Sequence, residues 1–233
     1  MWARIALVVA MRFQSLKLWP LSGFAVSFAY VEAAVVVYLR IVVGVEDIVR
    51  DVSTYDPFIA ATELGREAAT LLLLLAAGWA AGRNLQSRLG FALFAFGLWD
   101  IFYYIWLKVL LGWPRSLLDT DILFLIPLPW WGPVLSPVLI ALLCMAGGAF
   151  AVVRDERGES VRPTAVEWIS VGAGLLIILG AFMADALGAL PATAEDLNRL
   201  RPGPFRWGVY LPGLAAMSWG VLRATWPRGR CES

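Results

Sequence analysis

The sequence predicts an all-α fold, a polytopic membrane bundle of six transmembrane helices with a proline-rich segment before the fourth. Hydrophobic residues make up 60% of the 233 residues and charged residues only 16%. A water-soluble fold of this size cannot bury so much apolar surface in one core. Six apolar stretches fill most of the chain, and each is near the ~20 residues that a helix needs to cross a bilayer. The lipid bilayer is therefore the predicted solvent of this fold.

Residues 1–20 combine a short apolar run with Arg4, Arg12 and Lys17. They contain no small-residue cleavage site before the first clear span, so a removed signal peptide is the weaker interpretation. We expect an interfacial helix on the cytoplasmic face. The predicted organisation is this interfacial segment over 1–20, a single six-helix transmembrane domain over 21–226, and a short cytoplasmic tail over 227–233.

The six expected spans also give an orientation. They run from about Gly23 to Val43, Thr62 to Gly82, Leu89 to Leu111, Gly132 to Val153, Ala165 to Leu187 and Phe205 to Ala224. Cytoplasmic connections carry an excess of Lys and Arg. The short connection with Arg83 and Arg88 is basic, whereas the loop after the first span is acidic, with Glu46, Asp47, Asp51 and Asp56 against Arg50. We therefore expect a protein of the cell membrane with both termini in the cytoplasm.

The composition excludes several classes of function. The chain has no histidine, so a bis-histidine haem and the Ser/His/Asp and Cys/His mechanisms are excluded. Its two cysteines, Cys144 and Cys231, are too few for an iron–sulfur cluster or structural zinc. A formal net charge of +1 gives no basic surface for nucleic acid. We expect no metal, no cofactor and no nucleic-acid partner.

Glu32 and Asp100 are the most informative residues, because each lies near the middle of an expected span. An acid at that depth is costly, so it should face the bundle interior and be protonated, paired or bound to a cation. The two carboxylates should share one depth and could face each other. Tyr103 and Tyr104 follow Asp100 by three and four residues, which places their hydroxyl groups near its helical face as hydrogen-bond donors.

Further charged residues gather in the outer half of the expected bundle. Arg40 and Lys108 each follow a central acid by eight residues, or ~12 Å along the helix. Asp185 lies near the outer end of the fifth span. The predicted solute- or proton-binding residues are Glu32, Asp100, Tyr103, Tyr104, Arg40, Lys108, Glu63, Arg66 and Glu67. For Glu63, Arg66 and Glu67 a purely structural role at a helix end is the favoured interpretation, with Arg66 pairing either acid.

Residues 112–137 contain five prolines, which rule out a continuous helix. A re-entrant or interfacial lid over the outer half and an ordinary outer loop are both open interpretations. Asp119 and Asp121 are expected to cap a short helix at its start. Coordination of a hard cation such as Ca²⁺ or Mg²⁺ together with Glu63 and Glu67 is the weaker alternative, because the segment lacks the remaining ligands of a binding loop.

Small residues recur at helix-packing intervals in two spans. Gly78 and Gly82 form one set, and Gly180, Ala184 and Gly188 form another. Contacts within one bundle are the simpler interpretation of both, with dimerisation as the alternative.

These residues support a first hypothesis, a membrane protein whose outward polar cavity binds or transports a small solute, ion or proton through mid-membrane carboxylates. The alternative is a non-catalytic subunit that binds other membrane proteins. An enzyme that uses paired acids is the weakest hypothesis, since Asp185 should lie ~10 Å or more from the depth of Asp100. No catalytic residue is therefore predicted.

Overall fold

The computed structural model describes residues 15–43, 57–193, 196–197 and 200–225. It is a helical bundle with one β-hairpin. The elements are η1 (Ser15–Lys17), α2 (Leu18–Val43), α3 (Pro57–Ala81), α4 (Leu85–Leu111), β1 (Thr120–Phe124), β2 (Trp130–Pro133), α5 (Leu135–Glu156), α6 (Ala165–Phe182), α7 (Ala184–Ala189) and α9 (Trp207–Thr225).

Five helices of the described part are long and apolar enough to cross a membrane, and they indicate a multi-pass membrane protein. They lie over the first five predicted spans. α9 lies over the sixth; it has 19 residues and contains Pro212. α9 is not one of the five helices of the described part that are long and apolar enough to cross a membrane.

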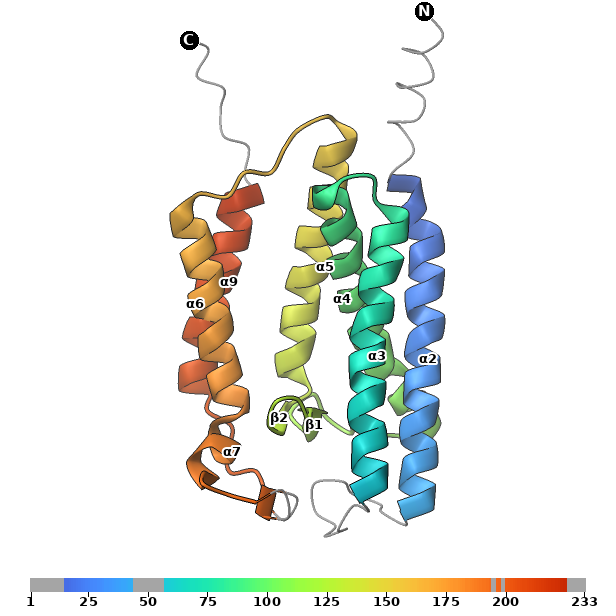
Figure 1. Cartoon of the computed structure of the whole chain (residues 1–233), viewed down its shortest axis with the longest axis vertical. Coiled ribbons are helices and arrows are strands. Elements are labelled where there is room, and N and C mark those ends of the chain that lie inside the picture. Colours follow the sequence, from blue (N-terminus) through green and yellow to red (C-terminus); the bar gives the residue numbers. More distant parts are fainter. Residues whose placement is uncertain (1–14, 44–56, 194–195, 198–199, 226–233) are drawn as a thin grey trace, which may run out of the picture.

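The long helices lie side by side, as Figure 1 shows. α4 is central, packing against α2, α3 and α5, while α6 and α9 form a second pair that contacts the rest through α5 and β2. We call the end with β1, β2 and α7 the hairpin end, and the end with the α3–α4 connection the turn end. α2 begins and α9 finishes at the turn end (Figure 1).

Helix boundaries follow local capping chemistry that hydropathy alone did not locate. α4 begins at Leu85, four residues before the predicted start, because the Asn84 side chain accepts the Ser87 N–H and the Ser87 hydroxyl accepts the Asn84 N–H. Thr164 and Glu167 form the same type of capping box at the start of α6. α2 begins at Leu18, so residues 18–20, predicted as interfacial, belong to the first long helix.

Glycines bring the helices together within this chain. A Cβ added at Gly78 or Gly82 would collide with the backbone of α4 at Ala92 or Arg88. Their predicted role as contacts inside one bundle is therefore confirmed. Gly174 and Gly213 join α6 and α9 in the same way, with a Cβ at Gly174 only 2.6 Å from the Gly213 carbonyl oxygen. Small residues lower the separation of helix backbones, which favours packing in a membrane.

The second predicted small-residue set lacks such contacts. A Cβ added at Gly180 or Gly188 would have no atom within 4 Å among the described residues. The expected fifth span also divides, because α6 ends at Phe182 and the short helix α7 begins at Ala184. This face of the α6–α7 segment is therefore not used for packing in the described bundle.

The proline-rich segment forms a β-hairpin that the sequence did not predict. β1 and β2 pair antiparallel, with Asp121 opposite Gly132 and a register shift between Ile122 and Phe124. The capping prediction for the two aspartates is wrong. Asp119 stabilises a turn by accepting the N–H groups of Arg115 and Ser116, and Asp121 is a buried strand residue. Each proline lacks a backbone N–H, so a chain interrupted by prolines cannot continue a helix. Its remaining backbone N–H and C=O groups can still form hydrogen bonds in a short pair of strands.

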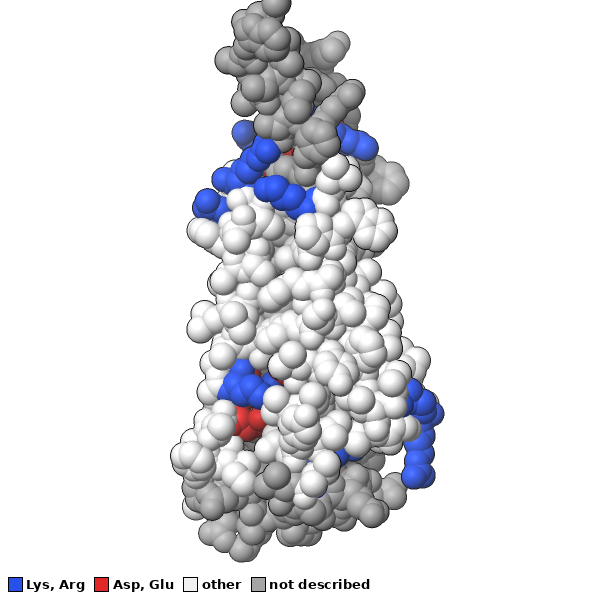
Figure 2. All heavy atoms as spheres, turned by 90° about the vertical axis from the view of Figure 1, so that its right-hand side faces the viewer, with Lys and Arg blue, Asp and Glu red and all other residues white. Residues whose placement is uncertain are grey.

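Charged side chains are distributed unevenly along the bundle. Figure 2 shows one face with Lys and Arg near both ends and an uncharged band between. Such a band is expected where helices meet hydrocarbon, because a charge there lacks water.

Candidate functional site

One large cavity lies between the two groups of helices. Its volume is about 1210 Å³, and its wall comes from α2, α3, α4, β1, β2, α5, α6 and α9 together with the segment that precedes α9. Ligand pockets in proteins are commonly about 300–1,000 Å³. The cavity is therefore large enough for more than an ion with its water shell. It reaches from Asp121 and Arg201 towards the hairpin end to Glu167 and Thr225 towards the turn end.

The charged part of the wall is concentrated towards the hairpin end. The charged and tyrosine side chains there are Glu32, Arg40, Glu63, Arg66, Glu67, Asp100, Tyr103, Tyr104, Asp121 and Arg201. All the predicted site residues except Lys108 are in this group. Towards the turn end the one charged side chain in the described wall is Glu167. The cavity is thus polarised, with an acidic half and an apolar half.

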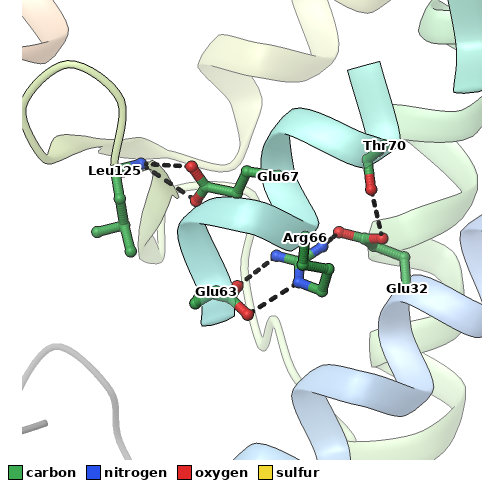
Figure 3. Close-up of polar contacts among 6 residues, drawn as sticks. All are labelled: Glu32, Glu63, Arg66, Glu67, Thr70 and Leu125. Carbon is green, nitrogen blue, oxygen red and sulfur yellow. Dashed lines mark hydrogen bonds and ion pairs between the residues drawn. The ribbon is translucent and has the colours of Figure 1, made fainter. Parts of the chain in front are cut away.

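Arg66 organises the first part of this polar group. On α3 its Nε donates to Glu63 Oε2 at 2.9 Å, and its two terminal nitrogens contact Glu63 and Glu32. The Thr70 hydroxyl group donates to Glu32 Oε2 at 3.1 Å, so Glu32 receives two partners from the neighbouring helix (Figure 3). Glu32 is only 6% exposed, and this pairing explains how its charge is accommodated.

Glu67 lies on the other side of α3 and contacts the hairpin. The backbone N–H of Leu125 donates to both of its carboxylate oxygens, at 3.1 and 3.0 Å (Figure 3). Charge-assisted hydrogen bonds of this kind are roughly twice as strong as neutral ones. Arg66 therefore pairs with Glu63 and Glu32, while Glu67 fastens the segment after β1 to α3.

Asp100 and Asp121 form the second part of the polar group. Asp100 comes from α4 and Asp121 from β1, and they are 8% and 5% exposed. The Tyr104 hydroxyl donates to Asp121 Oδ2 at 3.2 Å, so this tyrosine serves Asp121 and not Asp100 as expected. Asp100 Oδ2 is buried and has no hydrogen-bond partner among the described residues. The two carboxylates are close enough to interact electrostatically.

Burial raises the pKa of Asp121 from 3.8 to about 7. The charge of Arg40 and the hydrogen bond from Tyr104 oppose this shift but do not overcome it. Asp121 therefore exchanges its proton near neutral pH. Sequence reasoning did not include this residue in the site, although an Asp-Thr-Asp sequence in a long apolar stretch was a signal that could have identified it.

Arg40 and Lys108, the two bases that follow the central acids by eight residues, have different positions in the structure. The Arg40 guanidinium lies over the Trp113 ring, 5.0 Å from its centroid, and lines the cavity. Lys108 lies outside the cavity wall, where its Nζ donates to the carbonyl oxygens of Gly112 and Pro114 at 3.3 and 2.8 Å. Lys108 therefore stabilises the C-terminal end of α4. Asp185 pairs with Arg206 at 2.9 Å and is also outside.

Several hydrogen-bond donors in the wall lack an acceptor. Within the described ranges, the buried atoms without a partner include Arg40 Nε, Trp99 Nε1, Trp130 Nε1 and Arg201 Nη2, all from side chains that line the cavity. Buried polar groups in folded proteins are nearly always hydrogen-bonded. Four unpartnered donors and the unpartnered oxygen of Asp100 therefore occur in the wall of this cavity, while Arg88 Nε, outside the cavity, is also a buried donor without a partner in the described chain.

The residues that the structure describes contain no cluster of three or more His, Cys, Asp or Glu side chains arranged to hold a metal ion. Cys144 lines the cavity as a free, partly buried thiol. The charged and tyrosine side chains at the polar end can pair charges, form hydrogen bonds and exchange a proton. Comparison of the chain with protein-family models, curated proteins and solved structures finds no match.

Proposed function

We propose that this protein is a multi-pass protein of the cell membrane that binds a small solute or ion in the polarised cavity, with Asp100 and Asp121 as its principal binding residues. The observation that carries the proposal is the buried Asp100 carboxylate, which lines the cavity and has an oxygen without a partner in the described chain. A carboxylate in hydrocarbon costs several kcal/mol unless it is protonated or meets a positive or hydrogen-bonding group. A bound solute, cation or proton supplies that group.

The other charged residues have supporting roles in this proposal. Glu32 and Glu63 neutralise Arg66, and the pair that Arg66 forms with Glu32 holds α2 against α3. Glu67 keeps the hairpin segment at the cavity through Leu125. Arg40 and Tyr104 act on Asp121 from two sides. Tyr103 contributes its ring to the wall beside Trp99, with the ring centroids 6.2 Å apart.

We also propose that α9 is the sixth span and that the turn end is cytoplasmic. α9 packs along α6, and its described end lies at the same end of the bundle as the start of α2 (Figure 1). The connections at the turn end carry Arg83, Arg154, Arg157 and Arg162, in agreement with the positive-inside rule. The acidic half of the cavity would then face outward, with the hairpin as an interfacial or re-entrant lid.

The proposal is tested by mass spectrometry of protein extracted gently from its own membrane. We expect the native protein to retain a small compound, and the Asp100→Asn variant to lose it. Asp185→Asn is the matched control, because it makes the same chemical change outside the cavity and should retain the compound. A folded Asp100→Asn variant that retains as much compound as the native protein would falsify the assignment.

A second candidate function is assembly with another membrane protein. It is favoured by the open small-residue face at Gly180 and Gly188, because such faces allow close approach of a helix. Native-gel migration in mild detergent separates the two candidates. Stable co-migration with another chain that a Gly180→Leu substitution abolishes supports assembly, and a monomer that retains a small compound supports solute binding.

A further inference from the structure

The apolar half of the cavity is long as well as wide. On α5 its lining side chains run from Ile140 to Ala151, which corresponds to ~16 Å of helix. One leaflet of the bilayer core is about 15 Å thick. The facing wall is formed by apolar side chains of α6 and α9, including Val171, Leu175 and Val221. A hydrocarbon chain of ordinary lipid length therefore matches this half in both length and chemistry.

The acidic half offers groups of both signs to a ligand. Arg40 Nε and Arg201 Nη2 are buried donors on cations, and Trp99 and Trp130 present indole N–H groups. Asp100 Oδ2 is a buried acceptor on the same wall, beside Asp121. A head group that satisfies this set must contain an anionic acceptor and a cationic or neutral donor.

We propose that the bound solute is an amphiphile with a zwitterionic head group, an aminophospholipid in chemical class. Its ammonium group contacts Asp100, its phosphate accepts from Arg40, which acts on the neighbouring Asp121, and its acyl chain lies along α5, α6 and α9. This inference rests on the proposed function, because it names the class of solute that the same cavity takes.

Charge complementarity favours a zwitterionic head group over a purely anionic or a purely cationic one. The acids Glu32, Glu63, Glu67, Asp100 and Asp121 outnumber the bases Arg40, Arg66 and Arg201 on the described wall. A purely anionic head group would meet this excess of carboxylates. A purely cationic one would leave the arginine donors without an acceptor. A zwitterionic head group supplies an acceptor for the arginine donors and a positive donor for the carboxylates, and its binding leaves the net charge of the cavity unchanged.

Binding of short-chain lipids to the purified full-length protein tests the proposal. The probes are dihexanoyl phosphatidylethanolamine, dihexanoyl phosphatidylglycerol and free phosphoethanolamine, each titrated by isothermal calorimetry in detergent. We expect the ethanolamine lipid to bind at least tenfold more tightly than the glycerol lipid and than phosphoethanolamine. Equal affinity for the two lipids would overturn the zwitterionic head group, and equal affinity for free phosphoethanolamine would overturn the role of the acyl chain.

Substitutions inside and outside the cavity test whether the lipid binds in the cavity. Asp100→Asn and Arg40→Gln should each weaken binding of the ethanolamine lipid at least tenfold. Asp185→Asn and Arg206→Gln are the matched controls, since this ion pair lies outside the cavity, and both should bind as the native protein does. Each variant is first checked for a single symmetric peak on size-exclusion chromatography. Unchanged affinity in a folded Asp100→Asn variant contradicts the proposal.

The mass-spectrometry and lipid-binding results together distinguish failure of the lipid class from failure of the proposed function. If the native protein retains a compound that Asp100→Asn loses, but no ethanolamine lipid binds, only the lipid class is wrong. If the native protein retains no compound and binds none of the three probes, both proposals fail.

Discussion

Arg66 shows how a single side chain accommodates two acids at the edge of a membrane. It contacts Glu63 on its own helix and Glu32 on α2, and Glu32 is almost fully buried. Removing one member of a buried ion pair leaves a charge without compensation, which costs more than the pair itself contributes. The sequence allowed Arg66 to pair with Glu63 or Glu67; the partner on α2 is a consequence of tertiary packing.

The Arg66→Met substitution should therefore destabilise the protein by about 3 kcal/mol. The midpoint of thermal unfolding in detergent measures this effect, with Arg115→Met in the exposed connection before β1 as the control. Adding Glu32→Gln to Arg66→Met should restore part of the stability, because the unpaired charge is removed. A double variant whose loss equals the sum of the two single losses would contradict a direct pairing.

The raised pKa of Asp121 predicts that the stability of the folded protein decreases as the pH rises. Its pKa is raised from 3.8 to about 7 in the folded protein, so the folded state binds the proton more strongly than the unfolded state. Stability then falls as the pH rises from about 4 to about 7. The charged or titratable groups that interact with this carboxyl in the described chain are Arg40, Tyr103, Tyr104 and Asp100.

The measurement is the difference in unfolding midpoint between the native protein and Asp121→Asn across pH 4 to 8. An amide does not titrate, so the variant should lack the decline and gain stability relative to the native protein as the pH rises. Parallel pH profiles for the two proteins would show that Asp121 does not carry the dependence.

At the scale of the elements, glycines decide which helix faces approach each other. A Cβ added at Gly97 of α4 would collide with the Ala141 carbonyl oxygen of α5, whereas one added at Gly23 of α2 meets nothing within 4 Å of the described atoms. The sequence predicted the helices well because each is a long apolar run. It did not predict their partners, because a small residue shows only that close approach is allowed.

We expect Gly97→Val to destabilise the bundle by about 1–3 kcal/mol, the usual cost of forcing an extra side chain into a packed site. Gly23→Val is the control, since it adds the same side chain in open space. Thermal unfolding in detergent compares them. Equal effects of the two substitutions would mean that helix propensity, and not the α4–α5 contact, determines the result.

The hairpin shows which structural features can be predicted from a proline-rich sequence and which cannot. Prolines correctly excluded a continuous helix over 112–137. Whether such a segment becomes a loop or a strand pair depends on partners elsewhere, here Glu67 on α3 for the Leu125 N–H. That partner is 58 residues away in the chain, so no local pattern identifies it.

For the whole molecule, the proposed topology makes a test of sidedness possible. In a background with Cys144→Ala and Cys231→Ser, Pro204→Cys lies before α9 and Arg223→Cys lies in its last turn. If α9 is the sixth span, a membrane-impermeant maleimide should label Pro204→Cys in intact cells and Arg223→Cys only after permeabilisation. Labelling of both positions from one side would exclude a membrane crossing by α9, and the reverse pattern would invert the orientation.

The sequence by itself determined that this is a helical membrane protein, and it predicted that the charged residues within its spans gather towards one end. Both conclusions follow from the solvation cost of each side chain, which is a property of local composition. Only the tertiary structure decided which acids are paired. It joined Glu32 to Arg66, placed Asp121 beside Asp100 through an unpredicted hairpin, and moved Lys108 out of the cavity. Pairing depends on the distance between side chains from different elements, and only the packing of the helices and the hairpin sets that distance.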